Sequence, residues 1–155
     1  MKSKNLELLT FKIEGQNFAF PLPMVERVIQ AQTITRIEKA PEFIEGVIDI
    51  KGEIIGVISL RKRFSLGDKP LSVSDLILII NSPSGKIGVI ADETGDIIKI
   101  SEESVNAMKP IFEGMSLIDF FSNANGIFYI FDTSTILSNI ENSEIEQMIK
   151  SIQKA

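Results

Sequence analysis

The sequence contains no cysteine and no histidine. Without cysteine, the chain cannot form disulfides, thiolate metal sites or a cysteine nucleophile. Without histidine, it lacks the side chain that most often transfers protons near neutral pH and most often binds transition metals. A Ser-His-Asp triad is therefore excluded, and we expect no metal, no cofactor and no catalytic residue.

Long apolar runs are also missing. The longest, residues 76–80 and 127–131, are far shorter than the roughly 20 residues that a bilayer-spanning helix needs. The first residues show no signal peptide, because no continuous apolar segment follows the initial lysines. The net charge of -5 argues against nucleic-acid binding, which needs a cationic face. We therefore expect a cytoplasmic protein without direct membrane insertion and without a nucleic-acid partner.

Short apolar segments between glycines and prolines make up most of the chain. Its 155 residues fit one domain, residues 1–155, that can bury a sizeable core. Alternating or fully apolar patterns predict strands at residues 8–14, 18–20, 33–37, 47–50, 54–60, 76–80, 86–91, 97–100 and 127–131. Residues 54–58 and 76–80 are apolar on both faces, which indicates interior strands.

Few segments favour helix. Pro21 and Pro23 leave room for only a short helix at residues 24–29, and a single helical turn is predicted at residues 40–45. Two further helices are predicted at residues 134–140 and 144–154, the second with a capping box formed by Ser143 and Glu146. Its apolar residues recur with helical spacing, which favours packing on a barrel over a detached partner-binding helix.

About ten short strands followed by a helix predict small SH3-like barrels. A phrase of glycine and two aliphatic residues begins at Gly46 and recurs at Gly56 and Gly88. This recurrence hints at two related halves. Gly46, Gly52 and Gly56 do not fit a phosphate-binding loop, because their spacing matches no such motif.

Charged clusters are the remaining candidates for chemistry. Asp92, Glu93 and Asp96, and separately Glu102 and Glu103, lie at strand ends or in turns, where solvated acids are common. The segment from Asp92 to Asp96 lacks the length and the final glutamate of a calcium-binding EF-hand loop.

Four cations stand out in this acidic chain: Lys51, Arg61, Lys62 and Arg63. They form either a solvated hairpin edge or a local basic patch for an acidic protein partner.

Residues 40–64, APEFIEGVIDIKGEIIGVISLRKRF, resemble the central signature of the CheW chemotaxis coupling-protein family, approximately APxFIxGVxNLRGxIxPVIDLRxxF. The likeness extends outward to Phe11–Gly15, Phe18, Val25, residues 35–37 and 88–90, Asp92, Asp96 and residues 127–137. The resemblance implies a mainly β fold of two intertwined five-stranded SH3-like barrels, with short connecting helices and a C-terminal helix.

The resemblance also implies a function without catalysis. Members of this family bridge the cytoplasmic tip of a methyl-accepting chemoreceptor and the regulatory domain of the histidine kinase CheA. Carried onto this sequence, the likeness implies a receptor-binding groove formed by Val25, Arg27, Val28, Lys51, Gly88 and Thr94. It implies a kinase interface at Ile54 and Ile55.

The sequence departs from the family pattern at several of these positions. Arg27 stands where an acid is usual, Gly56 where a proline is usual, and residues 119–121 replace a glycine-rich segment. Arg27 and Lys51 are both cations, so they repel each other if they approach closely, which is tolerable only if both stay solvated or a partner supplies an acid. We therefore expect a receptor helix with Glu or Asp beside its apolar face.

Three alternative functions remain open at this point. One is a small-molecule-binding β-barrel, another is a CheW-like paralogue that serves a different signalling array, and a third is a hydrolase that uses carboxylates alone.

Overall fold

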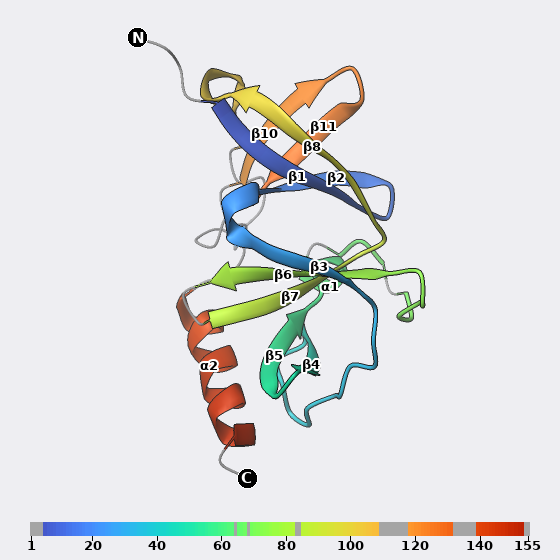
Figure 1. Cartoon of the computed structure of the whole chain (residues 1–155), viewed down its shortest axis with the longest axis vertical. Helices are drawn as coiled ribbons and strands as arrows, with labels where there is room; N and C mark the ends of the chain where they lie inside the picture. The colour runs from blue at the N-terminus through green and yellow to red at the C-terminus, as the bar shows by residue number, and fades with distance from the viewer. Residues whose placement is uncertain are drawn as a thin grey trace.

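Two β-sheets build the protein in the computed structural model (Figure 1), which describes residues 5–63, 65–67, 69–82, 85–108, 118–131 and 139–153. The six-stranded sheet has the order β8-β1-β2-β11-β10-β9 and contains β1 (Asn5–Ile13), β2 (Gln16–Pro21), β8 (Glu93–Ser101), β9 (Asn106–Met108), β10 (Ile118–Asn123) and β11 (Gly126–Ile130). The five-stranded sheet has the order β3-β6-β7-β5-β4 and contains β3 (Val25–Gln30), β4 (Ile44–Ile50), β5 (Glu53–Ile58), β6 (Leu76–Ser82) and β7 (Gly85–Ala91). The helical elements are η1 (Leu22–Met24), α1 (Leu60–Arg63), η2 (Glu102–Ser104) and α2 (Asn139–Gln153).

The two sheets exchange strands. The hairpin β1–β2 belongs to the six-stranded sheet, but the strand that follows it, β3, pairs with β6 in the other sheet. In the same way, the hairpin β6–β7 belongs to the five-stranded sheet, and the following strand β8 pairs with β1. Figure 1 shows β7 leading into β8 across the boundary between the sheets. The expected intertwining is therefore a reciprocal donation of one edge strand by each half.

The halves also agree in pairing pattern. In each sheet the donated edge strand is antiparallel to the first strand of a hairpin, and the second strand of that hairpin runs parallel to a strand of another hairpin. The strand register shows which residues of one half are equivalent to which residues of the other half. Leu9 lies between Phe20 and Ile97, as Leu78 lies between Val89 and Val28.

Three apolar clusters explain why several strands are buried on both faces. Alternate residues of one strand enter different clusters, because successive side chains point to opposite faces. In β6, Ile77 and Ile79 belong to a cluster within the five-stranded sheet, whereas Leu78 and Ile80 belong to a central cluster shared with Phe11 of β1. A third cluster lies within the six-stranded sheet and contains Leu8, Ala19, Phe121, Phe128 and Ile130. The predicted interior positions of β5 and β6 are confirmed.

The predicted short helix at residues 24–29 is wrong. After the single 3-10 turn η1, residues Val25–Gln30 form β3 and pair with β6. The two prolines stop the helix from extending, as expected, but Val25, Val28 and Ile29 are β-branched and fit a strand better once β6 offers a partner.

Smaller differences occur at other element boundaries. Thr35 alone pairs with Val47 where a strand at residues 33–37 was expected, and Leu60 begins α1 instead of ending a strand. β10 was not predicted at all. Helix α2 begins at Asn139, so Ser143 lies inside it and is not its N-cap. Residues 134–138 of the predicted helix at residues 134–140 lie outside the described residues.

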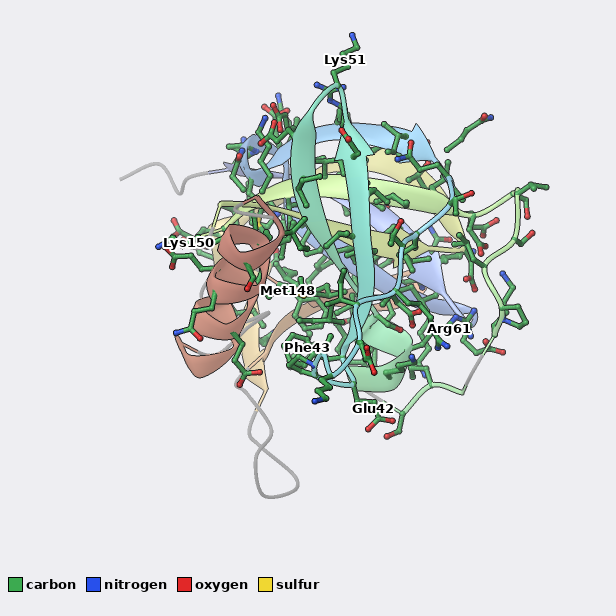
Figure 2. All side chains as sticks on the ribbon, turned by 90° about the horizontal axis from the view of Figure 1, so that it is seen from below. Glu42, Phe43, Lys51, Arg61, Met148 and Lys150 are labelled. Carbon is green, nitrogen blue, oxygen red and sulfur yellow. The ribbon has the colours of Figure 1, made fainter. Side chains whose placement is uncertain are left out.

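The C-terminal helix packs on β5, as predicted. A β-carbon added at Gly56 would lie 3.4 Å from Ile145 Cγ2 and 3.7 Å from Met148 Cε, so the missing side chain lets the helix approach the strand. Figure 2 shows Met148 on the side of α2 that faces the strands and Lys150 on the outer side. Ile145 is fully buried, whereas Ile149 is half-buried.

We expect Ile145→Ala to lower the free energy of unfolding by about 2 kcal/mol, because it removes a buried side chain next to a helix that can partly settle. Ile149→Ala should cost less, since part of its side chain already contacts solvent. Urea unfolding of both variants measures the difference, and equal losses would contradict the packing of α2 through Ile145.

Candidate docking surfaces

The outer edge of β3 carries three of the residues assigned to the receptor groove. Val25 packs against the central apolar cluster, Arg27 is exposed, and Val28 is 38% exposed. The register of β3 and β6 shifts between Val25 and Arg27, so Glu26 sits in a β-bulge. Bulges change the direction of neighbouring side chains. Here Arg27 and Val28 follow the bulge on the unpaired edge of the sheet.

Arg27 and Lys51, assigned to one groove, lie on β3 and in the β4–β5 turn, and another ion cluster lies on the sheet between them. Strands β6 and β7 separate β3 from β5 in the sheet, and Lys51 lies at the tip of the β4–β5 hairpin, where Figure 2 shows it pointing away from the molecule. Lys86 Nζ lies 3.1 Å from Glu26 Oε1 and 3.0 Å from Glu53 Oε1. Hydrogen bonds to Glu53 and Glu26 raise the pKa of Lys86. A lysine between two acids thus links β3 to the start of β5.

The other two groove residues are not on this edge. Gly88 is buried in β7, where an added β-carbon would lie 2.9 Å from Ile77 Cγ2. Its absent side chain therefore serves close packing of the sheet. Thr94 is exposed on β8, the edge strand of the other sheet, opposite Phe11.

The two residues assigned to the kinase interface differ in exposure. Ile55 is 2% exposed and belongs to the cluster within the five-stranded sheet. Ile54 pairs with Asp49 and is half-buried. Of these two residues, only Ile54 offers surface to a partner, and it lies on the same face of β5 as Gly56, which α2 covers.

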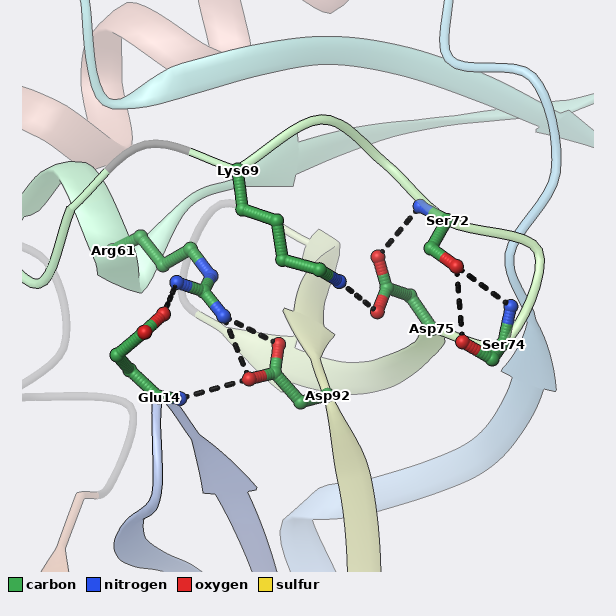
Figure 3. Close-up of polar contacts among 7 residues, drawn as sticks. All are labelled: Glu14, Arg61, Lys69, Ser72, Ser74, Asp75 and Asp92. Carbon is green, nitrogen blue, oxygen red and sulfur yellow. Dashed lines mark hydrogen bonds and ion pairs between the residues drawn. The ribbon is translucent and has the colours of Figure 1, made fainter.

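An ion cluster at the boundary of the two sheets was not predicted. Arg61 of α1 donates two hydrogen bonds to Asp92, at 2.8 and 2.6 Å, and a third to the carboxylate of Glu14 (Figure 3). The backbone N–H of Glu14 donates to Asp92 at 2.8 Å. These residues come from the segment after β5, the β7–β8 junction and the β1–β2 turn, so the cluster ties both sheets together.

Burial and ion pairing shift the pKa values of Asp92 and Arg61 in opposite directions. Burial, the largest influence, raises the pKa of Asp92, but the hydrogen bonds from Arg61 and from the Glu14 N–H outweigh it and leave this pKa below its usual value. Burial likewise lowers the pKa of Arg61, and its bonds to Asp92 and Glu14 more than compensate. Both groups are therefore charged at neutral pH.

The two alternatives given for residues 61–63, a solvated hairpin edge and a basic patch for an acidic partner, are both wrong for the two described side chains, which are paired and mostly buried. Arg61 is only 11% exposed and paired, and Lys62 Nζ lies 3.2 Å from Glu45 Oε1. The side chain of Arg63 lies outside the described set. Asp92 is likewise a structural ion-pair partner and not a solvated acid.

A second cluster holds the loop before β6. Asp75 is 3% exposed and accepts hydrogen bonds from Lys69 Nζ and from the Ser72 backbone N–H, both at 2.8 Å (Figure 3). Each buried charge in this region therefore has a partner, as buried charges require. Among the described residues, no three acidic side chains converge into a metal-ligand group.

No helix in the part of the chain that the structure describes is long and apolar enough to cross a bilayer.

Arg61 could have been noticed in the sequence only as a cation directly after a buried strand. Its partners Glu14 and Asp92 are far away along the chain, and nothing local links them. Tertiary structure was needed to identify the cluster.

Comparison with known proteins gives a consistent result. The family model of the CheW-like domain matches residues 7–141. The chemotaxis protein CheW of Treponema pallidum is 28% identical over 119 residues, which cover 74% of this chain and 70% of that protein. CheW of Thermotoga maritima is 29% identical over 103 residues, covering 66% and 68% of the two chains.

A solved structure is similar as well. The scaffolding protein TtCheW from Thermoanaerobacter tengcongensis superposes with a TM-score of 0.74 at 28% identity, over 82% of this chain and 88% of that chain. The predicted family resemblance and the predicted two-barrel fold are thereby confirmed. One sheet has the expected five strands, and the other gains the three-residue strand β9.

Proposed function

The chain belongs to the CheW-like domain family, and from this we propose that it is a non-enzymatic adaptor that couples chemoreceptors to a CheA-type histidine kinase in the cytoplasm. The observation that carries the proposal is the extent of the family match, which includes strands of both sheets. Fold similarity to a CheW scaffolding protein supports it. The small-molecule barrel is not favoured, because the relatives are chemotaxis proteins.

An adaptor must hold two docking surfaces in a fixed relation. For the receptor we assign Arg27 and Val28 on β3, with Val25 beneath them, and for the kinase regulatory domain we assign Ile54 at the start of β5. These surfaces lie on strands of one sheet, and the Glu26–Lys86–Glu53 bridge spans the strands between them. Lys51, Gly88 and Thr94 have separate places: a hairpin tip, a packing position and the opposite edge strand.

The receptor contact combines an apolar residue with an unpaired cation. Arg27 has no ion-pair partner among the described side chains, so a partner acid would meet it without first breaking an existing pair. Such a charge pair acts mainly on specificity and association rate. We therefore keep the expectation of a receptor helix that carries Glu or Asp beside its apolar face.

The test uses two variants, one expected to weaken only receptor binding and one expected to weaken only kinase binding. Arg27→Glu should weaken binding of the receptor tip about three- to tenfold at low salt, with a smaller loss at high salt, and leave kinase binding unchanged. Ile54→Asp should weaken binding of the kinase regulatory domain at least tenfold, on the order of an interface hot spot, and leave receptor binding unchanged.

Fluorescence anisotropy with the purified receptor tip and kinase domain from the same genome measures both affinities. If the wild-type chain bound neither protein, the adaptor function would be refuted. If both variants bound normally, only these residue assignments would fail.

A further inference from the structure

A hollow of about 390 Å³ opens beside the Arg61 cluster, between the chain segment that precedes β4 and the loop that precedes β6. Arg36 of the first segment and Lys69 and Leu71 of the second line it, together with Ser59 directly after β5. An adjoining hollow shares these four residues. The two hollows therefore form one continuous depression around Arg36, which we call the Arg36 hollow.

Hydrogen bonds hold both sides of the Arg36 hollow in place. The segment before β4 is fixed by Thr35, which exchanges two backbone hydrogen bonds of 2.9 Å with Val47. The backbone N–H of Ala31 donates to the carbonyl of Asp75 at 3.0 Å, and so joins this segment to the loop before β6. The Asp75 carboxylate in turn accepts hydrogen bonds from Lys69 and from a backbone N–H of its own loop. The hollow is therefore largely pre-formed, as small-ligand sites usually are.

Cations outnumber acids in this lining, although the chain as a whole has a net charge of -5. Most of the charged side chains are paired: Lys69 with Asp75, Lys62 with Glu45, and Arg61 with Asp92 and Glu14. Both acids of the lining are thus neutralised. Arg36, in contrast, is exposed and has no ion-pair partner among the described side chains. The hollow is therefore suited to an anion.

A buried hydroxyl adds a hydrogen-bond donor. Ser59 is 5% exposed, and its Oγ accepts a hydrogen bond from the backbone N–H of Lys62 at 3.3 Å. Its own hydrogen has no acceptor among the described residues, so an acceptor atom of a ligand would satisfy it. Figure 3 shows Lys69 reaching past Arg61 toward Asp75. The Lys69 ammonium has three donors, and its bond to Asp75 leaves donors for a ligand.

Apolar side chains line the same hollow. Ile34, Leu71 and Ile90 contribute to it, and Leu71 is 40% exposed, one of the few large apolar side chains exposed in the described chain. A free inorganic anion would leave this apolar surface in contact with water. An anion that carries an organic group would cover it, and burial of apolar surface favours binding.

We propose that the Arg36 hollow is a binding site for a small organic phosphate. In this site, Arg36 and Lys69 bind the phosphate oxygens, and Ser59 donates a hydrogen bond to one of them. Leu71 covers the organic group. A planar guanidinium suits phosphate, because it can donate two parallel hydrogen bonds to it. The inference goes beyond the proposed adaptor function and does not depend on it.

Isothermal titration calorimetry of the full chain with phenyl phosphate, and separately with sodium phosphate, tests the proposal. The two probes share the anion and differ in the apolar ring. We expect a Kd of about 1 mM or lower for phenyl phosphate, and binding of inorganic phosphate that is weaker by about fivefold or more. All titrations are made at one ionic strength, so that screening of charges is the same.

Three variants locate the site. Arg36→Gln should weaken binding of both probes about tenfold or more, because it removes the cation that contacts the phosphate. Leu71→Asn should weaken binding of phenyl phosphate about threefold or more and leave inorganic phosphate unchanged. Arg27→Gln is the matched control, because Arg27 is also an exposed cation without a described ion-pair partner but lies on β3, outside this lining. Its affinities for both probes should equal those of the wild type.

Thermal unfolding should be unchanged for all three variants, since each substituted residue is exposed. Equal affinities for the two probes, with Leu71→Asn without effect, would support the site with inorganic phosphate as its ligand. Failure of both probes to bind at about 10 mM, or equal weakening by Arg36→Gln and Arg27→Gln, would overturn the proposal. Benzoate that bound as tightly as phenyl phosphate would also overturn it, because any anion would then suffice. None of these results bears on receptor or kinase binding, so the adaptor function stands or fails separately.

Discussion

Gly46→Ala is expected to lower the free energy of unfolding by about 3–5 kcal/mol. An added β-carbon would collide with the carbonyl oxygen of Thr35 and lie 2.8 Å from Ile34 Cγ2. Thr35 and Val47 exchange two backbone hydrogen bonds of 2.9 Å at this point, so relieving the collision would break both. Overpacking against backbone costs about 1–3 kcal/mol, and each lost hydrogen bond adds about 1 kcal/mol.

The matched control is Gly67→Ala. Gly67 also has a positive φ, of 94°, but an added β-carbon there would meet no atom within 4 Å. This variant should lose only the backbone preference of glycine, about 1–2 kcal/mol. Urea unfolding of the two variants distinguishes collision from backbone strain, and similar losses would contradict the close approach of residues 34–35 to β4.

Arg61→Met is expected to lower the free energy of unfolding by about 3 kcal/mol at neutral pH. The substitution keeps much of the apolar stem but leaves the Asp92 and Glu14 carboxylates facing each other without their shared cation. Removing one partner of a buried ion pair costs about 3–5 kcal/mol, and partial exposure of Asp92, at 28%, places the expected value at the lower end.

The pH dependence of this loss has a defined sign. Because the pKa of Asp92 is lowered in the folded protein, its contribution to stability is complete above the unfolded value of about 4. The contribution is lost as the pH falls through the folded pKa. The difference between wild type and Arg61→Met should therefore be constant from pH 6 to 8 and shrink below about pH 4.

Lys12→Met provides the control for the charge effect. Lys12 pairs with Glu93 at 3.6 Å, but both side chains are more than half exposed, and exposed ion pairs contribute about 1 kcal/mol or less. A difference between wild type and Arg61→Met that stayed constant down to pH 2 would show that packing of the arginine stem, and not its charge, stabilises the boundary between the sheets.

The Arg61 cluster also bears on coupling between partners. It joins α1, which follows β5, to the β1–β2 turn and the β7–β8 junction. The angle between the sheets therefore depends on this cluster as well as on the central apolar cluster. An adaptor that positions receptor against kinase requires such a fixed angle.

The family and the fold class were predictable from the sequence because they depend on local patterns. The run from Ala40 to Phe64 carries the family signature, and the apolar periodicity of β1, β4, β5, β6 and β7 is set by successive side chains on opposite faces. The absence of cysteine and histidine likewise excluded disulfides, thiolate metal sites, a cysteine nucleophile and a Ser-His-Asp triad before the structure was known. The repeated glycine phrase does not mark the two related halves, because Gly46, Gly56 and Gly88 all lie in strands of the five-stranded sheet.

Other features depended on contacts between distant residues. Residues Val25–Gln30 formed a strand where a helix was predicted at residues 24–29, because β6 supplied hydrogen-bond partners and a helical pattern in so short a segment cannot compete with such pairing. Gly46, Gly56 and Gly88 look alike in sequence, yet the missing side chain serves a different contact at each position. It allows the close approach of Thr35 at Gly46, of α2 at Gly56 and of Ile77 at Gly88.

The charged residues show most clearly what the sequence could not predict. Sequence assigned Arg61 to a solvated hairpin edge or a basic surface patch, whereas strand exchange brings Glu14 and Asp92 to it from two other segments and leaves the Arg61 side chain only 11% exposed. The equivalence of Val28 with Ile97 also became visible only through strand register, because the two segments share almost no residue identities. Local sequence determined which residues of most strands are apolar, and tertiary structure decided which strands pair, which charges are neutralised within the fold and which remain open to partners.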